Sequence, residues 1–128
     1  MSTHVLLIED AEDTICLIAN ILEEEEDGYR LSVATDGEAG LLAARAERPD
    51  VILLDMSLPR LSGWDLAPRL RAEGVSIPII AITAHAMRDD RERALAAGCT
   101  DYISKPFEIT TLLAMLERYA PRTQPHLG

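Results

Sequence analysis

The sequence predicts an α/β fold in which helices cover both faces of a parallel sheet. Three continuous apolar runs, at 4–8, 51–55 and 77–82, have the length and composition of strands that are buried on both faces. Helical patterns separate the runs, as in successive βα units. An acidic or hydroxyl residue stands at or just after the end of each run, where ligands bind in open α/β sheets. The fold class and the place of the functional site are therefore predicted together.

Length and charge exclude several classes of function. The chain has 128 residues, enough for one domain with a single core, and its formal net charge is −10. That charge argues against direct nucleic-acid binding, because phosphate contacts need clustered Lys and Arg. Since no apolar run approaches membrane-spanning length and no signal-peptide pattern is present, we expect a cytoplasmic protein without membrane contact.

The cysteines and two of the histidines carry no motif. Cys16 and Cys99 are far apart and lack metal or redox spacing, so both are expected to be buried free thiols in a reducing compartment. His4 and His126 are expected at the surface. The sequence therefore predicts neither a zinc site nor a disulfide.

The first two strands differ in their patterns. The run at 4–8 is apolar throughout and ends in Glu9-Asp10. After the helix that follows, Leu31 and Val33 alternate with polar residues, which is typical of a half-exposed strand. We therefore place the second strand at an edge of the sheet.

The second helix has a start signal and an expected buried face. Thr35 and Glu38 have the spacing of a capping box, which predicts the beginning of the helix. Four small or apolar residues at helical spacing are expected to form its buried stripe: Ala39, Leu42, Ala43 and Ala46. Pro49 marks the exit from this helix toward the strand at 51–55.

The rest of the chain repeats the alternation. Gly63 opens a helix after the 51–55 run, and Gly98 closes a charged helix before the last strand. The expected elements are helices at 63–74, 87–97 and 107–119 and strands at 77–82 and 101–104. Residues 1–120 are expected to form the domain, and 121–128 have the composition of a disordered tail.

The burial of the strands predicts their order. The three continuous runs are central and the other two strands are edges, which fits the order 2-1-3-4-5 of a doubly wound, five-stranded, flavodoxin-like (βα)5 sheet. In that order the winding changes direction between the first and third strands. Glu9, Asp10 and Asp55 flank the crevice there, so topology and carboxylates select the same place. Taken alone, Asp55 could instead be a helix cap or a turn residue.

These carboxylates suggest a chemistry. Three carboxylates at one crevice repel one another, and an all-oxygen set suits Mg²⁺, or Mn²⁺ in its place. The ends of the later strands supply the Thr83 hydroxyl and the Lys105 amine. Together the groups suit a phosphoryl group carried on Asp55 as the nucleophile, with Thr83 and Lys105 holding phosphate oxygens.

Five separated motifs occur along the chain: Glu9-Asp10, Asp55, Leu58-Pro59 with Gly63, Thr83-Ala84, and Lys105-Pro106-Phe107. In this order and spacing they resemble the receiver domain of two-component response regulators, over about residues 4–120. The resemblance implies a phosphoacceptor of signalling that catalyses only its own phosphorylation and dephosphorylation. It also implies a histidine kinase or histidine phosphotransfer protein as the phosphate donor.

The resemblance implies a role for each matching residue. Asp55 would accept the phosphoryl group, Thr83 would be the switch hydroxyl, and Lys105 would be the phosphate-sensing amine before a cis Pro106. Four groups would hold the metal: the carboxylates of Glu9, Asp10 and Asp55 and the backbone carbonyl of Ser57. Of these, Glu9 would act largely through bound water.

Three further positions also match the family. Tyr102 would be the switch aromatic residue. Ser57 and His85, two residues beyond Asp55 and Thr83, match variable positions that tune the lifetime of the phosphate.

The last helix carries more apolar residues than one buried stripe requires, namely Ile109, Leu112, Leu113, Met115, Leu116 and Tyr119. We therefore expect the face formed by 87–97, 101–104 and 107–119 to bind a downstream protein or a second copy of the chain. Because no output domain is expected after residue 120, the protein is expected to be a stand-alone regulator.

Several alternatives stay open beside this prediction. The chain could be a receiver excised from a larger hybrid kinase or regulator, or a degenerate receiver that only binds partners. A flavodoxin-like electron carrier is less well matched, because residues 11–13 are largely acidic where a flavin phosphate would bind. A phosphatase of the haloacid dehalogenase type would need a second Asp two residues after Asp55, where Ser57 stands.

Overall fold

The computed structural model describes residues 2–25, 28–84 and 89–121. Within them, five parallel strands form one sheet in the order β2-β1-β3-β4-β5, which confirms the predicted topology. The strands are β1 (Thr3–Ile8), β2 (Tyr29–Ala34), β3 (Val51–Asp55), β4 (Ile79–Thr83) and β5 (Asp101–Ser104). The helices are α1 (Glu12–Glu23), α2 (Gly37–Glu47), α3 (Gly63–Ala72), α4 (Asp90–Ala97) and α5 (Ile109–Tyr119).

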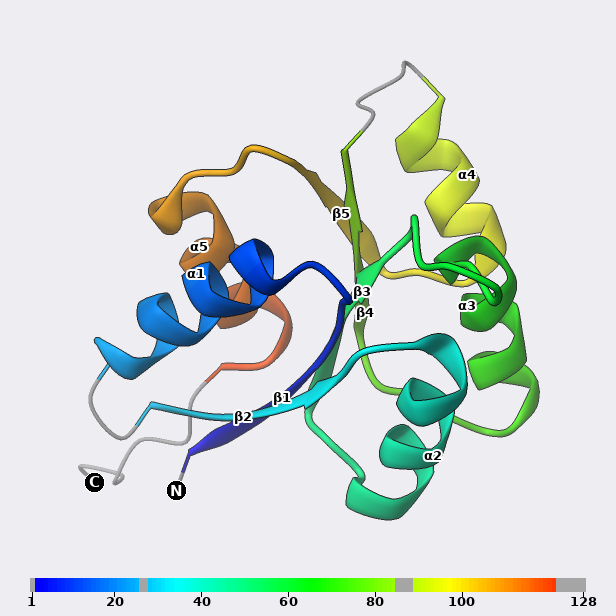
Figure 1. The fold of residues 1–128 in the computed structure, drawn as a ribbon, viewed down its shortest axis with the longest axis horizontal. Helices are drawn as coiled ribbons and strands as arrows, with labels where there is room; N and C mark the ends of the chain where they lie inside the picture. The colour runs from blue at the N-terminus through cyan, green and yellow to red at the C-terminus, as the bar shows by residue number, and fades with distance from the viewer. Residues whose placement is uncertain (1, 26–27, 85–88, 122–128) are drawn as a thin grey trace.

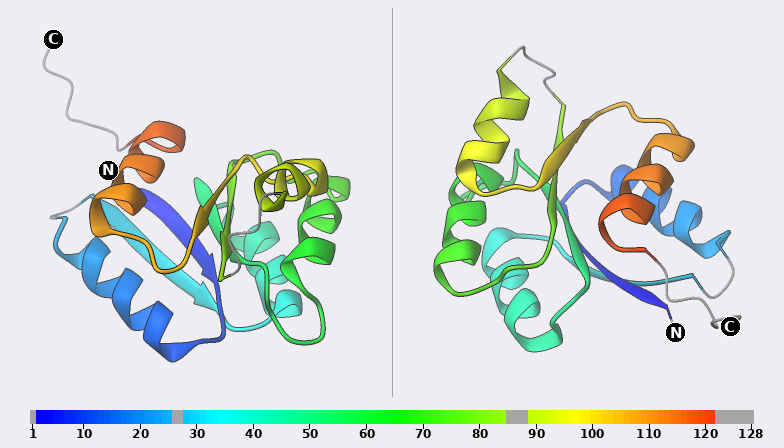
Figure 2. Two further views of the ribbon diagram at one scale, coloured as in Figure 1. Left: turned by 90° about the horizontal axis from the view of Figure 1, so that it is seen from above. Right: turned by 180° about the vertical axis from the view of Figure 1, so that it is seen from behind.

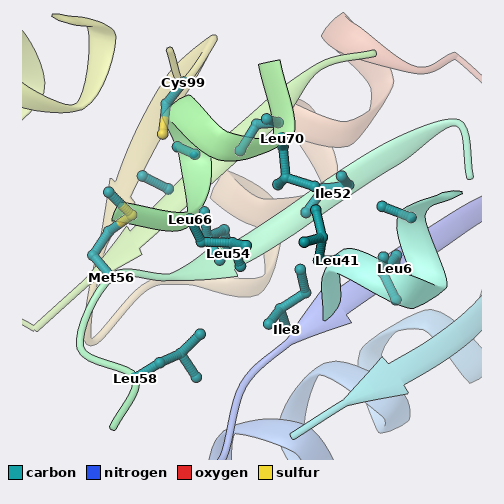
Figure 3. Packing of buried hydrophobic residues seen from close by; sticks show 14 of the residues in the cluster. Leu6, Ile8, Leu41, Ile52, Leu54, Met56, Leu58, Leu66, Leu70 and Cys99 are labelled. Carbon is teal, nitrogen blue, oxygen red and sulfur yellow. The ribbon is translucent and has the colours of Figure 1, made fainter. Parts of the chain in front are cut away.

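The helices form a layer on each face of the sheet. Helices α1 and α5 cover one face, and α2, α3 and α4 cover the other (Figures 1 and 2). The sheet supplies both cores because alternate strand residues point to opposite faces. In β1, for example, Val5 and Leu7 belong to the core under α1 and α5, whereas Leu6 and Ile8 belong to the core under α2, α3 and α4 (Figure 3).

The strand register brings the carboxyl ends of the strands to one edge. Ile8 pairs with Leu54, and Asp55 pairs with Ile82 in β4. Thr83 pairs with Ser104 at the end of β5. Residues that follow β1 and β5 are therefore neighbours of Asp55 and Thr83 although they are far apart in the sequence.

The buried stripe of α2 differs from the prediction. The residues buried in this helix are Gly37, Gly40, Leu41 and Ala44, whereas Leu42 is 64% exposed. Of the predicted residues, Ala39 and Ala43 are partly buried against this core, whereas Ala46 is exposed like Leu42. The prediction was wrong for these last two because glycine was not counted as a core residue. At Gly40 a Cβ atom would lie only 2.6 Å from Ile8 Cδ1, so glycine allows the helix to pack closely on β1.

The residue that caps the N-terminus of α2 also differs from the prediction. The side chain of Asp36, and not of Thr35, accepts a hydrogen bond from the Ala39 amide at 2.8 Å. Either side chain is chemically suited to the position. The helix therefore begins one residue later than the capping-box spacing indicated.

Two residue environments were predicted wrongly. Cys16 is exposed on α1, whereas Cys99 is buried as expected, and burial raises the pKa of its thiol to about 11. His4 is buried rather than at the surface, because its ring lies among polar side chains: Nδ1 accepts from Arg30, and Nε2 lies 2.7 Å from Ser32 Oγ. His126 lies outside the described residues.

No helix in the described ranges combines the length and the apolar character needed to cross a bilayer.

Candidate functional site

The carboxylates of Glu9, Asp10 and Asp55 meet at the carboxyl edge of the sheet. One ligand oxygen from each lies within 4.8 Å of the others. Glu9 and Asp55 are buried, with exposed fractions of 0% and 4%, whereas Asp10 is exposed at the rim. The prediction that β1 and β3 bring these side chains together is confirmed. The cluster combines buried acidic oxygens with an open side, as a site for a hydrated cation requires.

Glu9 is held by groups from two other parts of the chain. Its Oε2 accepts a hydrogen bond from the Ala11 amide at 3.2 Å, and its Oε1 accepts one from Lys105 Nζ at 3.0 Å. The pKa of Glu9 is nevertheless raised to about 6, chiefly by burial and then by its hydrogen bond with the Asp55 side chain. Lys105 and the Ala11 amide lower this pKa without reversing the shift. Lys105 therefore offsets only part of the effect of burial on the Glu9 carboxylate.

Asp55 is the last residue of β3 and is fixed by its neighbours. Its Oδ1 accepts a hydrogen bond from the Ser57 amide at 3.0 Å. The amide of the next residue, Met56, donates to the Ile82 carbonyl at 3.0 Å, so the chain stays attached to β4 just beyond the acceptor. A carboxylate has about four lone-pair sites, so this contact leaves Asp55 able to accept further ligands.

Thr83 and Lys105 end the neighbouring strands. Thr83 is buried at the end of β4, and its carbonyl accepts a hydrogen bond from the Lys105 amide at 2.7 Å. The Lys105–Pro106 peptide bond is cis, as the resemblance implied. The side chain of Lys105 is 25% exposed, whereas that of its partner Glu9 is fully buried.

Tyr102 lies on the same sheet face as Thr83. It pairs with Ala81 in β4, and Ala81 and Thr83 share a face because side chains alternate along a strand. The half-buried Tyr102 packs against the core under α2, α3 and α4. Ser57 is exposed beside Asp55, and His85 lies outside the described residues.

Most apolar residues of α5 are used within the fold. Leu112 and Leu116 are buried, and three others are partly buried against the same core, namely Leu113, Met115 and Tyr119. Ile109 is 54% exposed. The surplus predicted for this helix is therefore smaller than its sequence indicates.

A buried acid beside this helix was not singled out from the sequence. Asp101, at the start of β5, is 6% exposed, and its Oδ2 accepts a 2.5 Å hydrogen bond from the Tyr119 hydroxyl. Its Oδ1 accepts from the Tyr102 amide at 2.8 Å and lies 3.7 Å from Arg91 Nε. One carboxylate thus joins α4, β5 and α5. An acidic residue at the start of an edge strand is the only sign of this contact in the sequence.

The chain is similar to known response regulators along nearly all its length. Residues 5–117 match the model of the response regulator receiver domain. The transcriptional regulatory protein CseB of Streptomyces coelicolor is 41% identical over 126 residues, which are 98% of this chain and 52% of CseB. The probable transcriptional regulatory protein TcrX of Mycobacterium tuberculosis is 36% identical over 119 residues, 93% of this chain and 50% of TcrX. The chain therefore spans about half the length of these relatives.

Solved structures show the same fold. The chemotaxis protein CheY4 of Vibrio cholerae superposes with a TM-score of 0.85 at 27% identity, covering 93% of this chain and 99% of CheY4. The receiver domain of the sensor histidine kinase PA1611 from Pseudomonas aeruginosa gives a TM-score of 0.83 at 37% identity, covering 93% and 98% of the two chains. That structure has a magnesium ion coordinated in its active-site cleft. With the family model matched over most of its length, this chain belongs to the receiver domains of two-component response regulators.

Proposed function

We propose that Asp55 accepts a phosphoryl group from a histidine kinase or a histidine phosphotransfer protein. The observation that supports this role is the position of Asp55 among three carboxylates, within a cluster that the Lys105 amine also enters. Such a cluster provides a nucleophile together with groups that can hold the oxygens of a phosphoryl group. A helix cap or a turn residue would not need these neighbours.

The residues at the site fit a divalent cation. The three carboxylates lie within 4.8 Å of one another, and the donors are all oxygens, as Mg²⁺ or Mn²⁺ prefers. The carboxylates of Asp10 and Asp55 and the backbone carbonyl of Ser57 would hold the ion, with Glu9 acting largely through water. When bound, the ion supplies positive charge that offsets the phosphoryl oxygens.

The side chains of the chain perform the transfer itself. A carboxylate oxygen of Asp55 forms a bond to phosphorus, and the bond from phosphorus to the imidazole nitrogen of the donor breaks, leaving its electron pair on the imidazole. The Lys105 amine then faces one phosphoryl oxygen and the Thr83 hydroxyl donates to another. The same residues would serve later hydrolysis, while the exposed Ser57 and His85, two residues after Thr83 in the sequence, would control the access of water. The chain thus catalyses only its own phosphorylation and dephosphorylation.

The donor protein has to cover the open rim of the site, because its phosphohistidine must reach Asp55. A cavity of about 310 Å³ lies beside the site, next to Lys105, and is lined by Asp13, Thr14, Leu17, Lys105, Pro106 and Phe107. Leu17 is 44% exposed there. An apolar contact beside Lys105 suits a protein donor better than a small molecule alone.

The output would pass through the face formed by α4, β5 and α5. Phosphate on Asp55 would draw the Thr83 hydroxyl inward, and Tyr102 would follow because the two residues share a sheet face. The resulting shift between two pre-existing states would change how this face binds a protein partner or a second copy. The exposed Ile109 on α5 supports an apolar contribution to that contact.

Two forms of output are compatible with this function. We propose a receiver that acts as a separate cytoplasmic protein and contacts proteins rather than DNA, which its net charge of −10 supports. The second candidate is the receiver part of a longer transcriptional regulator, because CseB and TcrX are named as such and are about twice as long.

The direct test is mass spectrometry after incubation with acetyl phosphate and Mg²⁺. The wild-type protein should gain the mass of one phosphoryl group, and Asp55→Asn should not. Asp65→Asn, which removes an exposed carboxylate on α3, is the matched control and should label like the wild type. Undiminished Mg²⁺-dependent labelling of Asp55→Asn would exclude Asp55 as the acceptor.

A further inference from the structure

Two buried glycines border the loop that follows Asp55. This loop, residues 56–62, carries Ser57 and connects β3 to α3. Gly63 is the first residue of α3, at the end of the loop, and Gly37 is the first residue of α2, on a neighbouring helix. Each glycine packs against backbone atoms of the segment from Asp55 to Leu61.

Gly63 packs directly on the backbone of the proposed acceptor. A Cβ atom at this position would lie 2.7 Å from the Asp55 carbonyl oxygen and 2.6 Å from Met56 Cα. The Gly63 amide also donates to the Met56 carbonyl at 3.3 Å. Because the Met56 amide is bonded to Ile82 in β4, this backbone cannot move away without losing a sheet hydrogen bond. Any side chain at position 63 would therefore displace either α3 or the end of β3.

Gly37 makes the corresponding contact from α2. A Cβ atom there would lie 2.8 Å from the Leu61 carbonyl oxygen and 2.9 Å from Leu61 Cβ. The side chain of Asp36 caps the same helical turn, so the helix start is fixed. The Leu61 amide in turn donates to the Pro59 carbonyl at 2.8 Å, which makes the loop compact.

The two glycines are needed for space and not for backbone freedom. Among the described residues, the glycines with positive φ are Gly74 and Gly98. Gly37 and Gly63 therefore have backbone angles open to other residues, and what excludes a larger residue is the neighbouring backbone.

We infer that Gly63 and Gly37 are positioning residues for phosphoryl transfer, because they clamp the loop that sets the Asp55 carboxylate and the Ser57 carbonyl relative to Glu9 and Asp10. The effect on phosphoryl transfer rests on the proposed function. The close packing of the two glycines on the loop is a property of the fold and does not depend on it. Because Gly37 begins α2, the first turn of this helix also helps to hold the loop in place.

The test compares Gly63→Ala and Gly37→Ala with Gly40→Ala in the full chain. Gly40 is the matched control because it lies in α2 and the three atoms nearest to its added Cβ would be side-chain atoms of Ile8, the closest at 2.6 Å, and not backbone. All three variants should lose stability toward denaturant. Gly63→Ala should also bind Mg²⁺ about tenfold more weakly or worse, and Gly37→Ala several-fold more weakly, whereas Gly40→Ala should stay within about twofold.

A second measurement does not depend on metal or phosphate. In the metal-free protein, Gly63→Ala and Gly37→Ala should shift the NMR resonances of Asp55, Met56 and Ser57 and speed amide exchange at Ser57, whose amide donates to Asp55. Gly40→Ala should leave these signals in place. If Gly63→Ala does not fold, Gly37→Ala decides the outcome.

The outcomes separate the two claims. Unshifted loop resonances in the folded variants, with Mg²⁺ affinity like that of Gly40→Ala, would overturn the positioning role. If the wild type binds no Mg²⁺ and takes up no phosphate, the proposed function fails, and the loop resonances still decide whether the glycines clamp Asp55.

Discussion

Lys105 Nζ lies 3.0 Å from Glu9 Oε1 and forms an ion pair with a carboxylate that is wholly buried. The two residues are 96 positions apart in sequence, and the parallel register of the sheet brings them together. Lys105 thus has a partner before any phosphate arrives. In the phosphorylated protein the Lys105 amine would have to contact both Glu9 and a phosphoryl oxygen. One side chain would then link the carboxylate cluster to the phosphoryl group.

The first prediction concerns the dependence of stability on pH. The pKa of Glu9 is about 6 in the fold, above its ordinary value of 4.5, so the folded state binds more protons than the unfolded state between these values. The contribution of Glu9 to stability is therefore fully present below about pH 4.5 and is lost as pH rises through about 6. Without metal, denaturant unfolding should show this loss in the wild type and not in Glu9→Gln. Equal pH slopes for the two proteins would contradict the assignment.

The same ion pair can be tested directly. Lys105→Met should raise the pKa of Glu9 above that of the wild type, because the amine lowers it in the intact protein. The side-chain carboxyl resonance of Glu9, followed by NMR during a pH titration, measures the change. Lys105→Arg, which keeps the charge, is the control. An unchanged titration of Glu9 in Lys105→Met would show that the amine does not act on this carboxylate.

The third prediction is that Mg²⁺ binds the unphosphorylated protein weakly, since the carboxylate cluster exists before the phosphate. Asp10→Ala should abolish this binding, because it removes the exposed carboxylate of the cluster. A Mg²⁺ titration followed by Trp64 fluorescence or by NMR shifts near Asp10 measures it, with Asp65→Asn as control. Identical responses of the wild type and Asp10→Ala would exclude Asp10 as a ligand.

The fourth prediction concerns Asp101, which joins three elements through one carboxylate. Its hydrogen bond holds the Tyr119 hydroxyl and raises the pKa of that hydroxyl. Asp101→Ala should destabilise the fold by about 1–3 kcal/mol, because the half-buried Tyr119 hydroxyl and Tyr102 amide lose their acceptor, and Tyr119→Phe should cost about 1 kcal/mol. Denaturant unfolding measures both values. A cost below about 0.5 kcal/mol for Asp101→Ala would show that the contact adds nothing beyond an ordinary surface position.

The sequence predicted the sheet well because burial differs between central and edge strands. The uninterrupted apolar runs around Leu6, Leu53 and Ile80 identified the middle of the sheet, and the topology then placed Glu9 beside Asp55. Site residues at strand ends are predictable in this way, because the carboxyl ends of neighbouring parallel strands lie at the same edge of the sheet.

Contacts that depend on exact register or on close packing were not predictable. The pairing of Lys105 with Glu9 and the contacts of Asp101 depend on how far distant segments are shifted relative to one another along the strand direction. A single sequence does not show this shift. The buried face of α2 was predicted only in part because Gly37 and Gly40 are buried for their small size and carry no apolar side chain. A pattern of hydrophobic residues cannot show such positions.

The last prediction concerns the switch, and it rests on the register between β4 and β5. Thr83 pairs with Ser104, and Tyr102 pairs with Ala81 on the same sheet face. Under the proposed function, a movement of the Thr83 side chain toward phosphate would leave space that Tyr102 can enter. Thr83→Ala keeps the acceptor and the carboxylates, so it should still be phosphorylated by acetyl phosphate. Because it lacks the hydroxyl that phosphate would attract, its response in α4, β5 and α5 should be weak. NMR shifts on phosphorylation, recorded for both proteins over 89–119, measure that response. Thr83→Ser, which keeps the hydroxyl, should respond like the wild type. If phosphorylation of the wild type shifts only the loops around Asp55 and leaves 89–119 unchanged, this face is not the output surface.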